Sequence, residues 1–315
     1  SYTLLNDLLK AGIEVTKTKE SFWLKHSTAV AAILAKATVK ISPLANMPQQ
    51  ASKKLGAKRI GLWDVYGGSM PSGWLRWILE QHHFDFKLVF AKEIDKGNLH
   101  AKFDALIFVT RAIPGLKPET AGENTSKEPV ETDIPEEYRA TMGKITVAKS
   151  IPALRAFLEE GGDIITIGSS SNLAYHLNLP VKNALVEVVA GKERDLPGEK
   201  FYIPGSVMQV AVDDAVEANW GMTSKADVYF SASPVFKLSA EAIAHGSLIP
   251  LAWYASEKTL RSGWAFGQTY LEDGIAAFQA KVGKGNLFVY GPEVTFRAQT
   301  HNTFKMVFNQ LYESR

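Results

Sequence analysis

The alternation of apolar and polar residues in the first third of the chain predicts the opening of an open α/β sheet. Ile60–Val65 predicts a strand, a glycine-rich turn follows it, and Pro71 suits the first turn of a helix. Two short apolar runs, Lys87–Phe90 and Ala105–Thr110, predict strands that are covered on both faces. In such folds ligands bind beyond the carboxyl ends of the strands, so we expect any site just after Asp64 and in the neighbouring loops.

The same core continues in the second half of the chain. A helical pattern over Ile151–Glu160 ends at two glycines, and the strand pattern of residues 163–167 follows at once. The next turn, residues 168–172, leads into a short helix. Residues 180–270 show short strands separated by turns and not by helices, which predicts an antiparallel annex on the parallel core. A glycine hairpin and a helix from about Asn302 complete the pattern.

The N-terminal end predicts a small α/β segment of one leucine-rich helix, two short strands and a second helix. Residues 42–57 are poor in periodicity and predict a linker, so we divide the chain into residues 1–57 and residues 58–315. Within the second part, residues 111–148 contain four prolines among acidic and small residues. This stretch predicts a long polar surface excursion.

Composition and charge exclude several classes of function. The chain has 315 residues, a formal net charge of +2 and no Lys/Arg stripe, which argues against nucleic acid as a partner. There is no cysteine, which excludes disulfides, thiolate nucleophiles and cysteine metal sites. No apolar run approaches the roughly 18 residues of a membrane helix, and no signal peptide pattern is present, so we expect no membrane insertion.

Metal and phosphate signatures are weak. None of the seven histidines is followed by Glu or His three or four positions later, so we expect no metal site in this chain. The turn from Gly67 to Gly73 precedes a helix start, where an anion could bind. It matches neither GxGxxG nor a Walker loop, because Trp74 follows Gly73. We favour a tight turn made by Gly67 and Gly68 and a helix begun by Ser69.

The turn after the strand DIITI offers three hydroxyls, Ser169, Ser170 and Ser171, where a nucleophile elbow would lie. The motif GxSxG is not met, because Asn172 stands in place of the second glycine. Activation would require a base within hydrogen-bond reach, itself oriented by a third group. Serines that cap a helix are the favoured interpretation, and a serine nucleophile is the alternative.

Tryptophans offer a further candidate surface, because clustered aromatic side chains can stack sugars or peptides. Trp63, Trp74 and Trp77 lie close together in the sequence, and Trp253 and Trp264 follow later. The spacing of Trp74 and Trp77 places them on a helical face with core residues. We therefore expect this pair in the core or at a domain interface.

Five stretches resemble the C-terminal portion of large bacterial zinc carboxypeptidase-like (metallocarboxypeptidase) proteins. They are RIGLWDVYGGSMPSGWLRWILEQ, FLEEGGDIITIGSSSN, FYIPGSVMQVAVD, RSGWAFGQTYL and GKGNLFVYGPEVTFRAQTHNTFKMVFNQLY. The match runs in order over nearly the whole chain. That portion is similar to a class I glutamine amidotransferase-like domain. The resemblance implies a flavodoxin-like open parallel sheet with helices on both faces, plus the antiparallel β annex and the small N-terminal α/β segment.

The resemblance also implies where the chemistry of the parent protein lies. In that family an upstream peptidase domain binds zinc through an HxxE pair and a later histidine, with a glutamate as general base. None of those residues can be assigned here, so zinc is expected only upstream and no cofactor is expected in this chain. The chain begins at Ser1 and its first methionine is Met47, so we expect a piece of a longer, periplasmic or secreted protein whose upstream domain is its partner.

In class I amidotransferases the elbow carries a cysteine, and a later strand ends in His-Pro-Glu. Here the elbow is GSSSN and the later strand ends in Gly291-Pro292-Glu293, so only the glutamate remains. The resemblance therefore implies a degenerate catalytic site of Ser169, Ser170, Ser171 and Glu293. We expect a ligand-binding pocket where seven residues converge at the sheet edge: Asp64, Gly67, Gly68, Ser69, Ser169, Ser170 and Glu293.

These observations predict a non-catalytic amidotransferase-like accessory module that positions a peptide substrate or stabilises the peptidase domain. Two alternatives stay open. One is an independent serine-dependent hydrolase that uses Ser170 or Ser171 with His301 or His176 as its base. The other is a module that binds carbohydrate or cell-wall fragments through its tryptophans and the long acidic loop.

Overall fold

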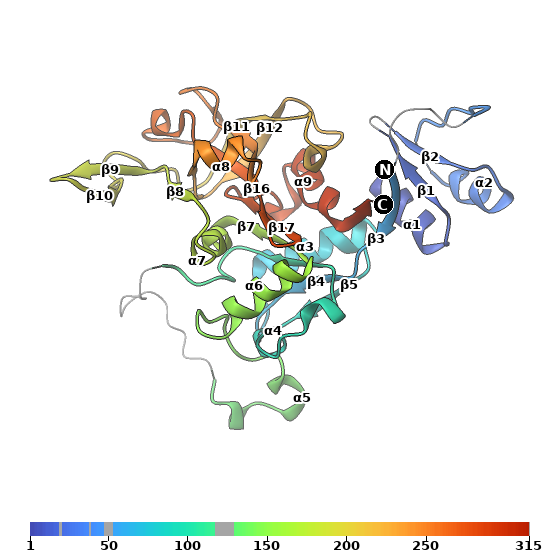
Figure 1. The fold of residues 1–315 in the computed structure, drawn as a ribbon, viewed down its shortest axis with the longest axis horizontal. Helices are drawn as coiled ribbons and strands as arrows, with labels where there is room; N and C mark the ends of the chain where they lie inside the picture. Colours follow the sequence, from blue (N-terminus) through green and yellow to red (C-terminus); the bar gives the residue numbers. More distant parts are fainter. Residues whose placement is uncertain (19–20, 38, 47–52, 117–128, 315) are drawn as a thin grey trace.

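The computed structural model describes residues 1–18, 21–37, 39–46, 53–116 and 129–314, which form an α/β fold around a long mixed sheet (Figure 1). Its main path runs in the order β12-β11-β14-β16-β17-β7-β6-β4-β5. The half from β17 to β5 is parallel, and the half from β12 to β17 is antiparallel. The predicted annex is therefore hydrogen-bonded into the same sheet as the parallel core.

The parallel half has the strand order of flavodoxin-like folds. Numbered along the chain its strands lie in the order 2-1-3-4-5, which confirms the predicted fold class. In chain order the strands are β4 (Ile60–Trp63), β5 (Phe86–Val89), β6 (Ala105–Phe108), β7 (Asp163–Ile167) and β17 (Gly285–Tyr290).

Helices cover this half of the sheet. α4 and α6 pack against each other, while α3 packs against the segment that follows β17 (Figure 1). The α-helices here are α3 (Met70–Gln81), α4 (Ala91–Asp95), α6 (Ser150–Glu160), α7 (Leu173–His176) and α9 (Phe304–Phe308). The shorter 3₁₀ turns are η1 (Leu99–Ala101), η3 (Gly168–Asn172), η6 (Phe296–Ala298), η7 (His301–Thr303) and η8 (Asn309–Leu311).

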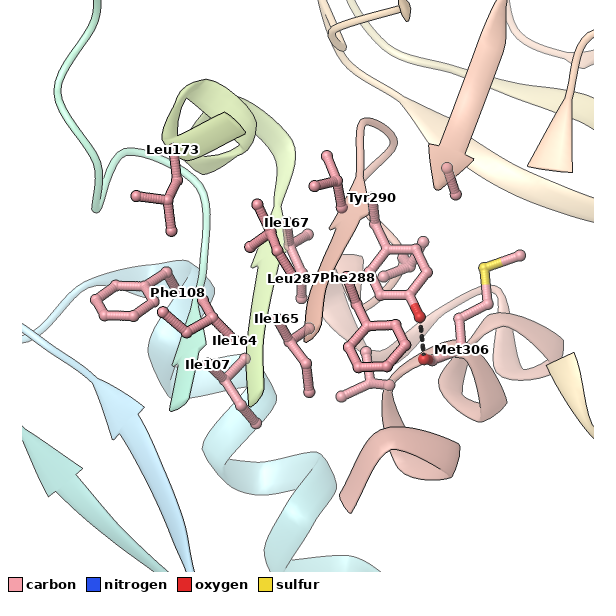
Figure 2. Close-up of a cluster of buried hydrophobic side chains, with 14 of the residues drawn as sticks. Ile107, Phe108, Ile164, Ile165, Ile167, Leu173, Leu287, Phe288, Tyr290 and Met306 are labelled. Atoms are coloured by element: carbon pink, nitrogen blue, oxygen red, sulfur yellow. Dashed lines mark hydrogen bonds between the residues drawn. The ribbon is translucent and has the colours of Figure 1, made fainter. Parts of the chain in front are cut away.

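The core lies where the central strands meet these helices. β4, β6 and β7 are buried along their whole length, because both faces of the sheet are covered. Figure 2 shows part of this cluster, in which Ile164, Ile165 and Leu287 lie among the side chains between β7 and β17. The hydroxyl of the fully buried Tyr290 donates to the backbone oxygen of Met306, so the last helix is hydrogen-bonded to the sheet (Figure 2).

The antiparallel half shows the expected alternation and one unexpected helix. β11 alternates buried and half-buried residues along its length, as a strand with one covered face does. A short helix, α8 (Ala240–Ala244), lies between β13 and β14, so the expectation of turns alone was wrong there. The strands are β8 (Val181–Asn183), β11 (Ser206–Val212), β12 (Lys225–Phe230), β13 (Phe236–Leu238), β14 (Leu248–Trp253), β15 (Leu260–Ser262) and β16 (Ile275–Val282).

Two pieces project from this body. A two-stranded ribbon of β9 (Val186–Val189) and β10 (Lys192–Asp195) leaves the annex and extends away from it (Figure 1). On the opposite side of the body lies the small N-terminal segment. Further short elements are α5 (Glu136–Arg139) and η2 (Glu131–Asp133) in the polar excursion, and η4 (Glu217–Asn219) and η5 (Gln268–Leu271) in the annex. The rest of the predicted excursion, residues 117–128, lies outside the described residues.

The small segment is built from both ends of the chain. Its sheet has the order β18-β3-β1-β2, and the N and C ends lie side by side (Figure 1). Its strand β3 falls within residues 42–57, so the linker prediction was wrong for Lys53–Ala57; residues 47–52 lie outside the described part. Its elements are α1 (Tyr2–Lys10), β1 (Val15–Lys17), β2 (Phe22–Leu24), α2 (Thr28–Leu34), β3 (Lys53–Ala57) and β18 (Tyr312–Ser314).

A buried ion pair joins these parts at the amino-terminal end of the parallel strands. The Nζ atom of Lys58 lies 2.5 Å from Oδ2 of Asp163, and the two side chains are only 11% and 12% exposed. The second carboxylate oxygen of Asp163 accepts the backbone and side-chain N–H groups of Asn286 at 2.9 and 2.8 Å. Lys58 also donates to the backbone oxygen of Gln310 at 2.9 Å. The pair therefore links residue 58 to β7, β17 and the C-terminal turn.

We predict that Lys58→Met lowers the free energy of unfolding by about 3 kcal/mol, because it leaves the carboxylate of Asp163 buried without its cation. Lys54→Met is the matched control, since Lys54 pairs with Glu14 at 2.6 Å with both side chains 63% exposed. The control should cost less than about 1 kcal/mol. Denaturant unfolding followed by circular dichroism measures both values, and equal losses would contradict the prediction.

Candidate functional site

The loop after β4 closes on itself. Oδ1 of Asp64 accepts the backbone N–H groups of Val65 and Ser69, both at 2.9 Å. Oγ of Ser69 then accepts the N–H of Ser72 at 3.3 Å and caps α3. Because the chain's own carboxylate takes a donor at this helix start, the loop is less suited to an external anion. The geometry agrees with the favoured sequence interpretation of a tight turn followed by a helix start.

The elbow serines fasten the loop after β6 to the turn after β7. The fully buried Ser170 donates to the backbone oxygen of Val109 at 2.5 Å. Its Oγ accepts the N–H groups of Ala112 at 3.0 Å and Ile113 at 3.2 Å. Ser171 donates to the oxygen of Gly168 at 2.7 Å, within its own turn. Both hydroxyls satisfy backbone groups.

Ser169 has a similar structural role at the rim of the same turn. Its Oγ accepts the N–H of Arg111 at 2.8 Å and lies 3.1 Å from Oγ1 of Thr110. The amide of Ser169 donates back to that threonine oxygen at 3.1 Å. Ser169 and Thr110 therefore contact each other through two hydrogen bonds across neighbouring parallel strands.

The two histidines considered as bases make other contacts. Nε2 of His176 lies 3.0 Å from the backbone oxygen of Pro114, and the ring of the exposed His301 lies 5.3 Å from the ring of Phe304, centroid to centroid. Among the residues that the structure describes, the hydrogen bonds of the elbow hydroxyls go to backbone groups and to Thr110. The alternative of a serine activated by His176 or His301 therefore has no geometric support.

Glu293 follows β17, and its carboxylate lies directly over the elbow turn. A Cβ atom placed on Gly168 would lie 2.2 Å from Oε1 of Glu293 and 2.6 Å from Oγ1 of Thr110, so only glycine fits there. The backbone of Gly168 has φ +60°, and that of Arg111 has φ 68°. A non-glycine residue in this region is strained, and such strain concentrates at functional sites.

Burial raises the pKa of Glu293 above its usual range, while a hydrogen bond from Thr110 and the positive charge of Arg111 act in the opposite direction. The half-buried carboxylate thus faces an exposed guanidinium across the turn. This pair of opposite charges can bind the charged ends of a small polar ligand.

The structure places the sequence-predicted pocket residues in two groups on one edge. Ser169 and Glu293 lie together over Gly168, and Asp64 lies with Gly68 and Ser69 at the end of β4. Separate hydrogen bonds hold the two groups. Sequence reasoning missed Thr110 and Arg111. Their signal was a polar pair placed directly after an apolar strand.

Other expectations about sites have different outcomes. Trp74 and Trp77 are 36% and 47% exposed and stack edge to face on the outer side of α3, so their assignment to the core was wrong; Leu75, Ile78 and Leu79 fill that role. Small hollows in the surface lie at the junction with the N-terminal segment, beside α1 and Tyr312, and away from the elbow. In the described ranges no group of three or more His, Asp or Glu side chains could hold a metal, and no helix could cross a membrane.

No protein-family model matches the chain, and no curated protein is similar to it in sequence. Solved structures of similar shape include one chain of a putative GMP synthase from Thermoplasma acidophilum (TM-score 0.45, 11% identity, 81% of this chain and 92% of that one). A putative ThuA-like protein from Bacteroides uniformis has a TM-score of 0.40 and 10% identity, over 80% of this chain and 88% of that one. The β-galactosidase of Bacillus circulans sp. alkalophilus has a TM-score of 0.45 and 8% identity over 82% of this chain, which spans 31% of that enzyme.

We predict that Gly168→Ala destabilises the fold by at least about 2 kcal/mol more than Gly67→Ala. Both glycines have a positive φ, +60° and +81°, so both variants bear the backbone cost of roughly 1–2 kcal/mol. Only the added methyl at Gly168 also collides with Glu293 and Thr110, since nothing lies within 4 Å of a Cβ on Gly67. Denaturant unfolding of both variants tests this, and similar losses would show that the carboxylate does not lie over the turn.

Glu293→Gln should change the dependence of stability on pH. Because burial raises the pKa of Glu293 in the folded state, the native protein gains from the proton at low pH and loses that gain as pH rises through the folded pKa. The glutamine variant has no such loss, so its stability relative to the native chain should rise from about pH 4 upward. Thermal unfolding across that range measures the difference, and a constant or falling difference would contradict the burial of this charge.

Proposed function

We propose that the chain is a non-catalytic amidotransferase-like accessory module of a secreted or periplasmic zinc metallocarboxypeptidase-like protein. In this proposal it positions a peptide substrate or stabilises the peptidase domain. The observation that carries the non-catalytic part is the engagement of all three elbow hydroxyls by the chain's own groups. The peptidase part rests on the sequence resemblance described above.

A nucleophilic hydroxyl must transfer its proton to a base while it attacks. Ser170 donates its proton to a backbone oxygen and accepts two N–H groups, so moving it would leave three buried backbone groups without partners. Each such loss costs about 1–3 kcal/mol, which is a large fraction of the stability of a typical domain. Fixing the two loops is therefore a better use of this serine than catalysis.

The polar edge supports a binding role in place of catalysis. The exposed guanidinium of Arg111 can pair with a carboxylate, such as that at the end of a peptide. The carboxylate of Glu293 lies beside it and offers an acceptor for an amino group. A module that binds such groups beside a carboxypeptidase would hold the substrate near the zinc of the upstream domain.

A fluorophosphonate probe tests the loss of catalysis. We predict that the 315-residue chain shows no labelling above that of Ser169→Ala and Ser170→Ala variants, while an active serine hydrolase in the same reaction is labelled. Labelling that disappears in either variant would contradict the proposal. In the longer polypeptide, Arg111→Ala should then raise the KM of zinc-dependent peptide hydrolysis with kcat retained. An unchanged KM, together with unchanged rate and stability after removal of residues 1–315, would refute the accessory role.

A further inference from the structure

Four aromatic side chains form an exposed cluster on the antiparallel half, far along the sheet from the parallel edge described above. We call it the aromatic platform, and it consists of Tyr202, Trp264, Phe266 and Tyr270. These side chains are 53%, 56%, 45% and 45% exposed, which is unusual for aromatic residues in the same small region. Exposed apolar patches of this kind mark binding sites more often than they mark accidents of composition.

The backbone beneath the platform is fixed by specific contacts. Oγ of Ser206 accepts the N–H of Trp264 at 2.9 Å and donates to its backbone oxygen at 2.5 Å. Tyr202 and Phe266 exchange two backbone hydrogen bonds, at 3.0 and 3.1 Å. The exposed rings therefore project from a rigid support, which lowers the entropy cost of binding a ligand.

Two glycines make this support possible. Gly263 has φ +97°, and a Cβ there would lie 2.6 Å from Oγ of Ser206. Gly267 has φ +72°, and a Cβ there would lie 2.0 Å from the backbone oxygen of Lys200. The segment between the two glycines carries Trp264 and Phe266, and it lies against the body only because both flanking positions lack a side chain.

The arrangement of the rings suits a flat, uncharged ligand. The rings of Trp264 and Phe266 are nearly parallel, at 10° with centroids 6.3 Å apart, and Tyr202 lies 6.0 Å from Trp264 at 64°. Aromatic faces are electron-rich and attract C–H bonds. One face of a pyranose ring presents such C–H bonds, while the hydroxyls around its rim can bond to the hydroxyls of Tyr202 and Tyr270.

The charges near the platform cancel one another. Oε2 of Glu187 lies 2.5 Å from Nζ of Lys200, and its Oε1 lies 2.7 Å from a guanidinium nitrogen of Arg194. Lys200 is also close enough to Tyr270 for its charge to act on that hydroxyl. The ammonium and guanidinium groups share one carboxylate within the chain, and the platform itself carries no charge. Neither feature favours an acidic or a basic ligand.

From this geometry we propose that the aromatic platform binds uncharged pyranose sugars of a polysaccharide by stacking on Trp264 and Phe266. A protein partner would be expected to meet aliphatic side chains as well, whereas the four members of the platform are all aromatic. The ligand class is neutral hexose or N-acetylhexosamine chains. The proposed site is independent of the elbow region and of the peptidase role.

Isothermal titration calorimetry of the 315-residue chain with cellohexaose and with chitohexaose tests the proposal. We predict saturable binding of at least one of the two sugars and at least a tenfold loss of affinity in Trp264→Ala. Phe266→Leu keeps apolar bulk but removes the ring, so it should also lose at least fivefold if stacking is the interaction. Trp77→Ala is the matched control, because Trp77 is 47% exposed on α3, and it should bind like the native chain.

Three outcomes would overturn the proposal. They are no binding of either sugar, binding that Trp264→Ala does not weaken, and equal losses in Trp264→Ala and Trp77→Ala. Binding of a decaproline peptide at the platform in place of both sugars would assign it to peptide recognition and would also refute the proposal. Circular dichroism of each variant shows that a loss of binding is not a loss of fold. The fluorophosphonate experiment reports on the elbow, so the two proposals can fail separately.

Discussion

The buried contact between Lys58 and Asp163 sets the geometry on which the rest of the molecule depends. Asp163 begins β7 and holds the backbone of Asn286 in β17, so it fixes how these two parallel strands are aligned. A shift of one residue would turn every side chain of a strand to the other face. At the far end of the same two strands, that alignment brings Glu293 over Gly168. A charge pair at one edge of the sheet therefore determines what meets at the other.

The elbow turn illustrates how a reactive position can become a structural joint. Ser170 occupies the place where a nucleophile would lie in an amidotransferase-like fold, yet its hydroxyl joins the loops after β6 and β7. Arg111 and Gly168 adopt left-handed backbone conformations on the two sides of this joint. The strain of Arg111 is retained because its N–H group is held by Ser169.

The sequence predicted the regular, locally encoded parts of the fold. β4, α3, α6 and β7 were expected from their period and their caps, and so was the turn at Gly283. Long-range pairing could not be foreseen: β3 has little apolar character, and it forms a strand because β18 and β1 flank it. The same limit applies to the site, where the closeness of Thr110 to Glu293 depends on tertiary packing. Trp77 was misjudged because its helical spacing adjoins that of the core leucines.

The pairing of β3 with β18 has a consequence for how the molecule is made. β3 comprises residues 53–57 and its partner residues 312–314, so more than 250 residues of synthesis separate them. Until the ribosome releases the last strand, one edge of β3 keeps its amide and carbonyl groups open to other chains. The lysines at positions 53 and 54 lie on this strand, and charged residues of this kind discourage intermolecular pairing. The nascent chain thus carries its own protection against aggregation during that interval.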